Sequence, residues 1–398
     1  MRNVERGRAV ESAPDPNNDI PRVIFYDLAE KSGKKEFTIA LKKAQGKRVV
    51  LPWSVFAERT QKKAKKKGIY VDNAEVFTRD SLALGKPKDY WDGKEEELAR
   101  RIAEDDDPKN FIIAHFPFEN KASFVKMHRK PEFKRVQQSR SQGIISEVAQ
   151  EANETKTMGV AGAGVGSAIA LESVRAGLEN LVIADGGVLT PHDGNRQWGP
   201  LARSFGENHA IYTMKQAFQL FPFLNGECIP QNLGTAGEVP NTYDISKFVA
   251  KSDFIFDEVD NLKVKAILRY KAREAGKPVA QITDLGTGVA VQFDDPRKDL
   301  YPCNGRLTPE VFSELMEADL TNFDTFMYFA INIFMGADNI TPETRSSFEE
   351  SRKREFYHIP QSGIAISKAG TAGYEVFAAY HEGKAIPPER LIGYDWAA

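Results

Sequence analysis

The fold of this chain is decided by the stretch from residue 158 to residue 185. It opens with Met158-Gly159-Val160-Ala161, turns through Gly162-Ala163-Gly164-Val165-Gly166-Ser167, runs on through the largely apolar segment 168–176, and ends on Leu181-Val182-Ile183-Ala184-Asp185. A strand, a glycine-rich turn, a helix and a second strand that ends in an acid, all within about 30 residues, predict a nucleotide-binding βαβ unit. Glycines let the turn approach phosphate oxygens, and the helix that follows offers them unpaired N–H groups.

Further strand patterns follow this unit. Short apolar runs predict strands at 254–256, 279–283 and 289–293, with helical patterns between them. Strands that alternate with helices favour an α/β fold with a Rossmann-like, mostly parallel sheet and helices on both faces. From Leu307 onward the pattern is mainly helical, and the small residues of 365–380 should allow close helix packing.

The sequence before this domain predicts a smaller mixed α/β module. We expect a flexible tail over 1–20, the module over 21–134, and a nucleotide-binding domain with a helical C-terminal part over 135–398. The polar segment 135–157 is predicted to be helical. Within the module, the patterns predict strands at 22–26, 47–52 and 110–116 and helices at 53–67 and 93–105.

Composition and charge limit the possible classes of function. The 398 residues include 54 Lys and Arg, 56 Asp and Glu and 41% hydrophobic residues, which is typical of a globular protein. Residues 1–150 hold 31 basic and 23 acidic side chains, which leaves 23 basic and 33 acidic ones for the rest. No apolar run is long enough to span a bilayer and no secretory pattern opens the chain. We therefore expect a cytoplasmic protein with no membrane partner and, at a net charge of −2, no nucleic-acid partner.

A second motif follows the acid at the end of the βαβ unit. Asn195-Arg196-Gln197 lies ten to twelve residues beyond Asp185. An acid at that strand end accepts hydrogen bonds from ribose hydroxyls. A fixed guanidinium binds the oxygens of a triphosphate bidentately, whereas hydride transfer has no use for this motif. The two motifs therefore favour ATP, with an NAD(P)-dependent oxidoreductase as the alternative.

Together with Asp257-Glu258-Val259-Asp260-Asn261, these motifs resemble those of the ubiquitin-activating-enzyme-like ThiF/MoeB/HesA adenylyltransferases. The resemblance covers about residues 135–300. It implies ATP- and Mg²⁺-dependent adenylation of a carboxylate on a peptide or small protein, by a homodimer. Members that transfer sulfur carry paired Cys-x-x-Cys zinc motifs, and this chain has none. In this respect it is similar to the branch that modifies ribosomally made peptides.

The resemblance also assigns roles to individual residues. It implies that Asp185 holds the ribose and that Asp260 holds Mg²⁺ near the phosphates. An arginine from the partner subunit would complete the site, with Arg140 as the candidate and Arg135 as the second choice. On the residues alone, Arg196 could instead cap a helix and Asp260 could be the N-cap of a helix over 261–273. The phosphates would be lined by Gly162, Gly164, Gly166, Asn195, Arg196 and Gln197.

Three positions depart from the family pattern. Gly187 stands where the family has a second acid, and Asp193 replaces the first Asn of Asn-x-Asn-Arg-Gln. His209 occupies the place of the family's lysine, and Lys215 is the alternative cation. Because neutral imidazole is a weaker phosphate partner than ammonium, we expect an altered ATP site with His209 among its catalytic groups. A catalytically silent relative that serves as a scaffold is the alternative.

Two further features bear on the substrate. Cys228 lies in an apolar strand pattern and is predicted to be inert, while Cys303 lies in a loop and is the better candidate for a nucleophile. An acyl adenylate that passes to an amine, amide or internal nucleophile needs neither cysteine. Five lysines within Gln61–Lys67 could attract an acidic peptide, or could simply be a solvated helix face.

Overall fold

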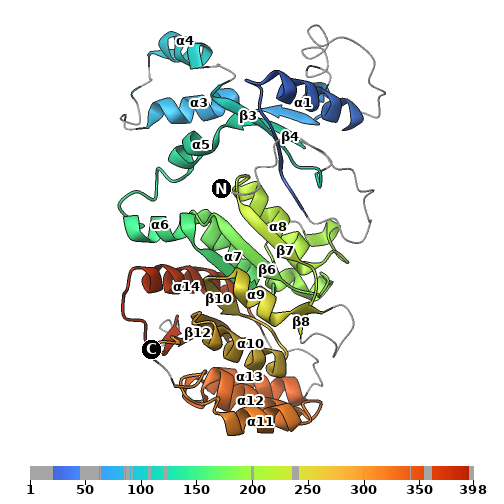
Figure 1. Cartoon of the computed structure of the whole chain (residues 1–398), viewed down its shortest axis with the longest axis vertical. Helices are drawn as coiled ribbons and strands as arrows, with labels where there is room; N and C mark the ends of the chain where they lie inside the picture. Colours follow the sequence, from blue (N-terminus) through green and yellow to red (C-terminus); the bar gives the residue numbers. More distant parts are fainter. Residues whose placement is uncertain are drawn as a thin grey trace. The chain divides into compact units, whose positions relative to one another are not determined.

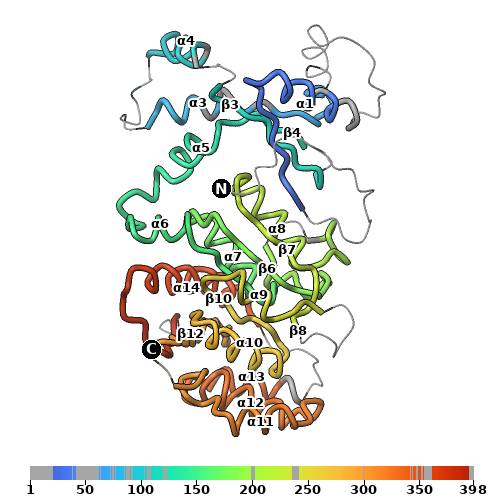
Figure 2. The backbone as a smooth tube through the Cα atoms, viewed as in Figure 1, coloured from blue at the N-terminus to red at the C-terminus, as the bar shows by residue number. Residues whose placement is uncertain are grey.

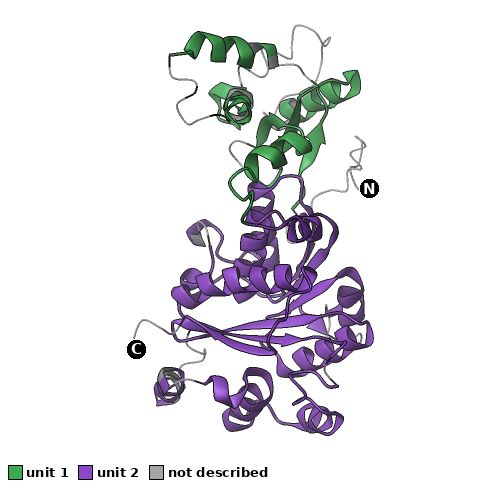
Figure 3. Cartoon of the chain, turned by 90° about the vertical axis from the view of Figure 1, so that its left-hand side faces the viewer, with its two compact units in different colours: residues 1–144 green, residues 145–398 purple. Residues whose placement is uncertain are grey.

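The computed structural model of the chain divides into two compact units, residues 1–144 and residues 145–398 (Figure 3). The predicted tail over 1–20, the predicted strand over 47–52 and most of the predicted helix over 53–67 lie outside the described residues. The described residues are 21–44, 62, 64–84, 86, 90, 93–105, 109–119, 123–198, 201–234, 242–298, 300–340, 342–353 and 361–393.

The first unit is built on a four-stranded sheet in the order β1-β3-β4-β2. Strand β4 pairs antiparallel with β3 and parallel with β2. Aromatic side chains such as Phe37, Tyr70 and Phe124 fill its core. The predicted strands near 22–26 and 110–116 and the predicted helix near 93–105 are confirmed, whereas β2 and β4 were not predicted. The elements are β1 (Ile24–Tyr26), α1 (Lys31–Ala44), β2 (Tyr70–Asp72), α3 (Ala74–Ala83), α4 (Glu95–Asp105), β3 (Phe111–His115), β4 (Phe124–His128) and α5 (Lys130–Gln137).

The second unit contains a sheet of seven strands among the described residues, in the order β13-β12-β11-β10-β5-β6-β7. The five strands from β11 to β7 run parallel, and β12 and β13 add two antiparallel pairings at one edge. This confirms the predicted Rossmann-like, mostly parallel sheet. The strands are β5 (Thr157–Ala161), β6 (Asn180–Ala184), β7 (Asn225–Ile229), β10 (Phe254–Asp257), β11 (Val279–Leu285), β12 (Gly288–Asp294) and β13 (Glu389–Ile392).

Helices cover both faces of this sheet (Figure 1). Strands β5, β10 and β12 are buried along almost their whole length, as expected for strands that are covered on both sides. One apolar cluster packs α9 and α10 on the sheet, and another joins α10 to the C-terminal helices. The helices are α6 (Glu147–Thr155), α7 (Val165–Arg175), α8 (His209–Leu220), α9 (Ile245–Lys251), α10 (Leu262–Glu274), α11 (Pro309–Glu317), α12 (Phe323–Phe329), the π-helix η3 (Ala330–Met335), the 3₁₀ helices η1 (Pro191–Asn195), η2 (Leu201–Arg203) and η4 (Ala337–Asn339), α13 (Pro342–Lys353) and α14 (Gly363–His381); β8 (Leu233–Gly234) and β9 (Tyr243–Asp244) form a small parallel pair.

The helix of the βαβ unit packs against the last helix of the chain. The red α14 lies beside the green α7 in Figure 2, although about 200 residues separate them in sequence. A Cβ atom on Gly373 would lie 2.7 Å from Cγ2 of Ile169, so this contact requires a residue without a side chain. The close packing predicted from the small residues of 365–380 is confirmed.

One predicted helix was wrong. The segment 135–157 is not continuous: α5 ends at Gln137, and α6 begins only after Ser146. Ser146 begins the second helix, because its backbone is extended and its hydroxyl accepts a hydrogen bond from the N–H of Ala149. A serine in this arrangement is an N-cap, which starts a new helix.

Candidate nucleotide-binding site

The glycine-rich turn lies between the end of β5 and the start of α7, at the carboxyl edge of the parallel strands. Gly162 has a φ of +93°, and a Cβ atom there would lie 2.3 Å from the carbonyl oxygen of Glu258. A Cβ atom on Gly166 would lie 2.5 Å from Cγ1 of Val160. Gly164 is the N-cap of α7. The turn therefore brings its backbone and the first N–H groups of α7 to the sheet edge, where anions bind in this type of fold.

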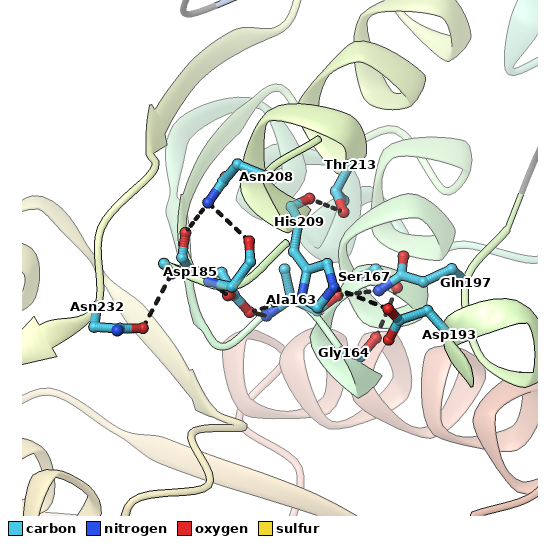
Figure 4. Close-up of polar contacts among 12 residues, drawn as sticks. Ala163, Gly164, Ser167, Asp185, Asp193, Gln197, Asn208, His209, Thr213 and Asn232 are labelled. Carbon is cyan, nitrogen blue, oxygen red and sulfur yellow. Dashed lines mark hydrogen bonds and ion pairs between the residues drawn. The ribbon is translucent and has the colours of Figure 1, made fainter. Parts of the chain in front are cut away.

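Asp185 follows β6, and its carboxylate accepts a hydrogen bond that fixes this turn. Its Oδ2 accepts a hydrogen bond of 2.6 Å from the N–H of Ala163, and its Oδ1 accepts one of 2.6 Å from the N–H of Gly187 (Figure 4). Burial alone would raise the pKa of Asp185, but these N–H groups and the imidazole of His209 outweigh burial and lower that pKa. The residue predicted to bind ribose is thus an ionised, partly accessible carboxylate beside the glycine turn.

Gln197 supports the same turn from the opposite side. Its side-chain Nε2 donates a hydrogen bond of 2.6 Å to the carbonyl oxygen of Ala163. Gln197 is buried, so this bond is shielded from water. From the sequence, we expected Gln197 to lie next to the phosphates. In the structure, its side chain contacts the backbone of the glycine turn instead.

Arg196 is held by an acid that the sequence identified only as a departure. Its Nη2 lies 2.7 Å from Oδ1 of Asp193, which is fully buried. Asp193 also accepts hydrogen bonds from the N–H and the hydroxyl of Thr190, at 2.6 and 2.9 Å. The bond from the N–H of Thr190, together with one from the N–H of Asp193 to the side-chain oxygen of Thr190, forms a capping box at the start of η1. Nη1 of Arg196 donates to the carbonyl oxygen of His192 at 3.4 Å, so the guanidinium does interact with the end of a 3₁₀ helix.

His209, at the start of α8, lies between two carboxylates (Figure 4). Its Nδ1 is 3.6 Å from Oδ2 of Asp185, and its Nε2 is 3.4 Å from Oδ2 of Asp193. Burial would lower the pKa of His209, but the two carboxylates outweigh burial and raise it. Both ring nitrogens therefore face acids, so the imidazole links Asp185 to Asp193, the acid that holds Arg196.

Two asparagines complete the support of Asp185, and neither was predicted from the sequence. Nδ2 of Asn208 donates to the carbonyl oxygens of Asp185 and Gly187, at 2.7 and 3.0 Å, while its Oδ1 caps α8 by accepting from the N–H of Ile211. Asn232 accepts a hydrogen bond of 3.2 Å from the N–H of Gly186. Asn208 directly precedes the α8 pattern, and that position is a signal for an N-cap.

Asp260 follows β10 and is exposed. It is not a helix cap, because Oδ1 of the next residue, Asn261, accepts from the N–H groups of Lys263 and Val264 at the start of α10. Neighbouring protein atoms nevertheless remove water from the carboxyl group, and this desolvation raises the pKa of Asp260. The charge of Asp185 adds to the effect, and the charges of Arg196 and His209 oppose it. The motif residues from four separate segments therefore meet at one edge of the sheet.

The first acid of the same motif has a structural role. Asp257 is fully buried, 3.1 Å from Nζ of Lys265 and 2.8 Å from Nε of Arg269. Arg269 is also fully buried, and it pairs with Asp294 at 2.5 Å. This charged network lies beneath Asp260 and fixes the end of β10 against β11 and β12.

Asn195 binds the beginning of α14. Its Nδ2 donates a hydrogen bond of 3.0 Å to the carbonyl oxygen of Gln361. Nε2 of Gln361 in turn donates to Oδ1 of Asp284, at 3.2 Å, and the charge of Arg196 acts on Asp284. Asp284 was not predicted, although its position at the carboxyl end of a parallel strand could have identified it. No sequence signal pointed to Gln361.

The remaining candidate cations belong to the first unit or are already paired. Lys215 forms an ion pair with Glu207. Arg140 belongs to the first unit, in an exposed turn after α5. Nη2 of Arg135 is 2.5 Å from Oε1 of Glu132, which leaves Arg135 the weaker of the two candidates for a role in trans.

Neither cysteine is placed to act as a nucleophile. Cys228 is buried in β7, as predicted, and Cys303 is fully buried although it lies in a loop, so the accessible thiol considered from the sequence was wrong. Burial raises the pKa of both thiols to about 12. Thiols of this kind are almost entirely protonated at neutral pH and react slowly.

Two kinds of feature are absent from the described residues. No helix in the described ranges has both the length and the apolar character needed to cross a membrane. In the same ranges, no three His, Cys, Asp or Glu side chains are grouped so as to bind a metal ion by themselves.

Several solved structures are similar to this chain. PaaA shares 15% identity over 66% of this chain and 78% of its own, with a TM-score of 0.43. E. coli MccB, solved with AMPCPP and MccA, shares 10% identity over 60% of each chain, with a TM-score of 0.40. E. coli TcdA, a tRNA N6-threonylcarbamoyladenosine dehydratase solved with AMP, shares 15% identity over 63% of this chain and 95% of its own, with a TM-score of 0.44. Sequence identities and TM-scores this low do not bear on the function of the chain.

Sequence comparison identifies the family. No curated protein matches the chain. The model of the ThiF family matches residues 137–354, which is more than half of the chain and includes the glycine turn, Asp185, the Asn-Arg-Gln motif and Asp260. The chain belongs to the ThiF family.

Proposed function

We propose that this protein uses ATP and Mg²⁺ to adenylate a carboxylate on a peptide or small protein. One observation carries the proposal. Asp185, Arg196, His209 and Asp260 come from four segments, and the charges of the first three all act on Asp260 at the edge of the sheet where the glycine turn lies. Membership of the ThiF family supports the same reaction.

The residues at this edge have the chemistry that adenylation requires. A carboxylate oxygen attacks the α-phosphorus of ATP, and pyrophosphate leaves with the electrons of the bond that breaks. Arg196 would offset the charge on the phosphates, and the N–H groups at the start of α7 would bind their oxygens. Asp185 would accept the ribose hydroxyls. Catalysis would consist mainly of positioning and electrostatic stabilisation.

The fit to Mg²⁺ rests on Asp260. Magnesium usually takes one or two carboxylates from a protein and the rest of its ligands from phosphates and water. Asp260 is exposed at the sheet edge that carries the glycine turn, and the charges of Asp185, Arg196 and His209 act on it. Asp260 would hold the ion, and bound Mg²⁺ would neutralise charge on the phosphates.

Two of the three departures from the family pattern have a counterpart in the site. Asp193 holds Arg196, and His209 bridges Asp185 and Asp193. We infer that His209 acts by positioning these two acids, because carboxylates already face both of its nitrogens. Arg140 remains our candidate for an arginine supplied by a second subunit of a homodimer.

A peptide that is rich in acidic residues is the substrate class we propose. The described lysines of the 61–67 run, namely Lys62, Lys65, Lys66 and Lys67, are exposed and provide a basic surface on the first unit. Opposite charges steer such a peptide and speed its association. Changing Lys62, Lys66 and Lys67 to Glu should weaken peptide binding and flatten its dependence on salt; unchanged affinity and salt dependence would reject this role.

The test uses a pool of synthetic peptides with free Asp, Glu and C-terminal carboxylates. Wild-type protein should release pyrophosphate from ATP with Mg²⁺ and the pool, and Arg196→Ala should reduce the rate at least about 100-fold. Arg297→Ala is the matched control, since Arg297 is an exposed arginine paired with Asp295 after β12. Binding of NADH without ATP would favour an oxidoreductase, and ATP binding without turnover would favour a silent scaffold.

A further inference from the structure

Asp284 is a buried carboxyl group that the adenylation step does not use. It is only 8% exposed and lies at the carboxyl end of β11. Because β10 and β11 are parallel, this end lies at the same sheet edge as Asp260.

Three contacts fix Asp284 relative to the nucleotide site. Nε2 of Gln361 donates to Oδ1 of Asp284 at 3.2 Å, and the carbonyl oxygen of Gln361 accepts from Nδ2 of Asn195 at 3.0 Å. The hydroxyl of Ser362 donates to the carbonyl oxygen of Gly286, in the turn between β11 and β12, at 2.6 Å. The start of α14 therefore ties Asp284 to the turn that carries Arg196.

The second oxygen of Asp284 has no such partner. Oδ2 is buried and makes no hydrogen bond with the described residues. A buried acceptor left unpaired in this way destabilises the fold, so a native protein that retains one usually has a use for it. The charges of Arg196 and Asp260 both act on this carboxyl group, and it acts on Glu258, so it belongs electrostatically to the adenylation site.

We propose that Asp284 accepts the proton of an amine or amide nucleophile, carried by the substrate, that attacks the acyl adenylate. This role rests on the proposed function. The nitrogen forms a bond to the carbonyl carbon, the bond from that carbon to the phosphate oxygen breaks, and AMP leaves with its electron pair. The N–H proton passes to Oδ2 of Asp284. The substrate must supply the nucleophile, because both cysteines are buried.

The environment of Asp284 suits a proton acceptor. Burial raises its pKa to about 6, with Asp260 adding to the effect and Gln361 and Arg196 opposing it. A carboxylate with a pKa close to neutral takes up a proton more readily than an ordinary aspartate does, yet it is still mostly ionised at pH 7.

The test separates the two half-reactions with Asp284→Asn and Asp284→Ala. With the peptide pool, ATP and Mg²⁺, both variants should release a first equivalent of pyrophosphate, while steady AMP release falls about 100-fold. Hydroxylamine, which attacks activated acyl groups without a base, should restore AMP release and yield a hydroxamate. Glu227→Gln, an exposed and ion-paired acid on β7, is the control that should match wild type.

The outcomes distinguish the possible failures. Loss of the first pyrophosphate equivalent in both folded variants, or AMP release that hydroxylamine does not restore, would overturn the role of Asp284. Wild-type AMP release by the variants would also overturn it. A wild-type protein that releases no pyrophosphate with any peptide of the pool would instead defeat the proposed function.

Discussion

The side-chain amide of Gln197 donates a hydrogen bond of 2.6 Å to the carbonyl oxygen of Ala163. On its other side, the N–H of Ala163 donates to Oδ2 of Asp185 at the same distance. Ala163, a single residue of the glycine turn, is thus held through both of its backbone polar groups, by the Asn-Arg-Gln motif and by the acid after β6. The glycine turn, the Asn-Arg-Gln motif and Asp185 are therefore joined by direct hydrogen bonds that need no bound nucleotide.

Removing the Gln197 bond should loosen the turn without removing a charge. We expect Gln197→Met, which keeps the size of the side chain, to raise the KM for ATP while kcat changes little. Because a buried carbonyl loses its donor, the free energy of unfolding should fall by about 1–2 kcal/mol. Steady-state kinetics and urea unfolding measure the two effects. An unchanged KM in the folded variant would show that Gln197 does not position the turn.

The His209 cluster predicts a pH dependence of stability. The pKa of His209 is raised above its ordinary value of 6.5, so its contribution is fully present below that pH and is lost as pH rises through the folded pKa. The pKa values of Asp185 and Asp193 are lowered, so their contribution is present above 3.8 and is lost as pH falls. The cluster should therefore stabilise the protein most between these two values.

Urea unfolding of His209→Gln tests this dependence. The variant should lose about 2 kcal/mol at about pH 5.5 and much less at about pH 9, relative to wild type at the same pH. His192→Gln is the control, since the imidazole of His192 is exposed beside Asp193, one of the two acids that His209 faces. An equal loss at both pH values would mean that His209 contributes packing alone.

Two glycines of the site allow a paired comparison. A Cβ atom on Gly166 would lie 2.5 Å from Cγ1 of Val160, whereas one on Gly194 would meet no atom within 4 Å. Gly166→Ala should therefore lower the free energy of unfolding by about 1–3 kcal/mol and weaken ATP binding, and Gly194→Ala should do neither. Thermal unfolding and calorimetric titration with ATP measure both. Equal behaviour of the two variants would contradict the tight turn.

The buried thiols predict a reaction that is independent of cysteine. Pyrophosphate and AMP release by Cys228→Ala and Cys303→Ala should stay within about twofold of wild type once the variants are folded, because neither thiol can reach a substrate. Both cysteines of the native protein should also resist iodoacetamide until urea is added. A mass adduct of the substrate on either thiol would contradict this expectation.

Much of the fold and part of the site could be predicted because local patterns carried them. The run from Met158 to Asp185 specified its strand, turn and helix through glycines and apolar residues that are close in sequence. The helix predicted over 135–157 failed because Ser146, an N-cap, is hard to distinguish from the other polar residues around it. The antiparallel pairing of β12 with β13 joins segments about 100 residues apart, and no local pattern contains it.

The rest of the site depends on contacts at a distance. In the sequence, Asp193 only stands where the family has an asparagine. Its role as the buried partner of Arg196 and His209 follows from the contact between η1 and the start of α8. Gln361 lies just before α14 and reaches Asp284, which is 77 residues earlier in the chain. Contacts of this kind arise from topology, so a single sequence leaves them open.

The central claim is that a substrate carboxylate attacks the α-phosphorus of ATP, and isotope transfer tests it most directly. The peptide pool is prepared with oxygen-18 in its carboxylates and incubated with the protein, ATP and Mg²⁺, and the nucleotides are analysed by mass spectrometry. The account predicts AMP that carries one oxygen-18 atom, together with unlabelled pyrophosphate. Formation of ADP with labelled phosphate, or of AMP without label, would contradict it.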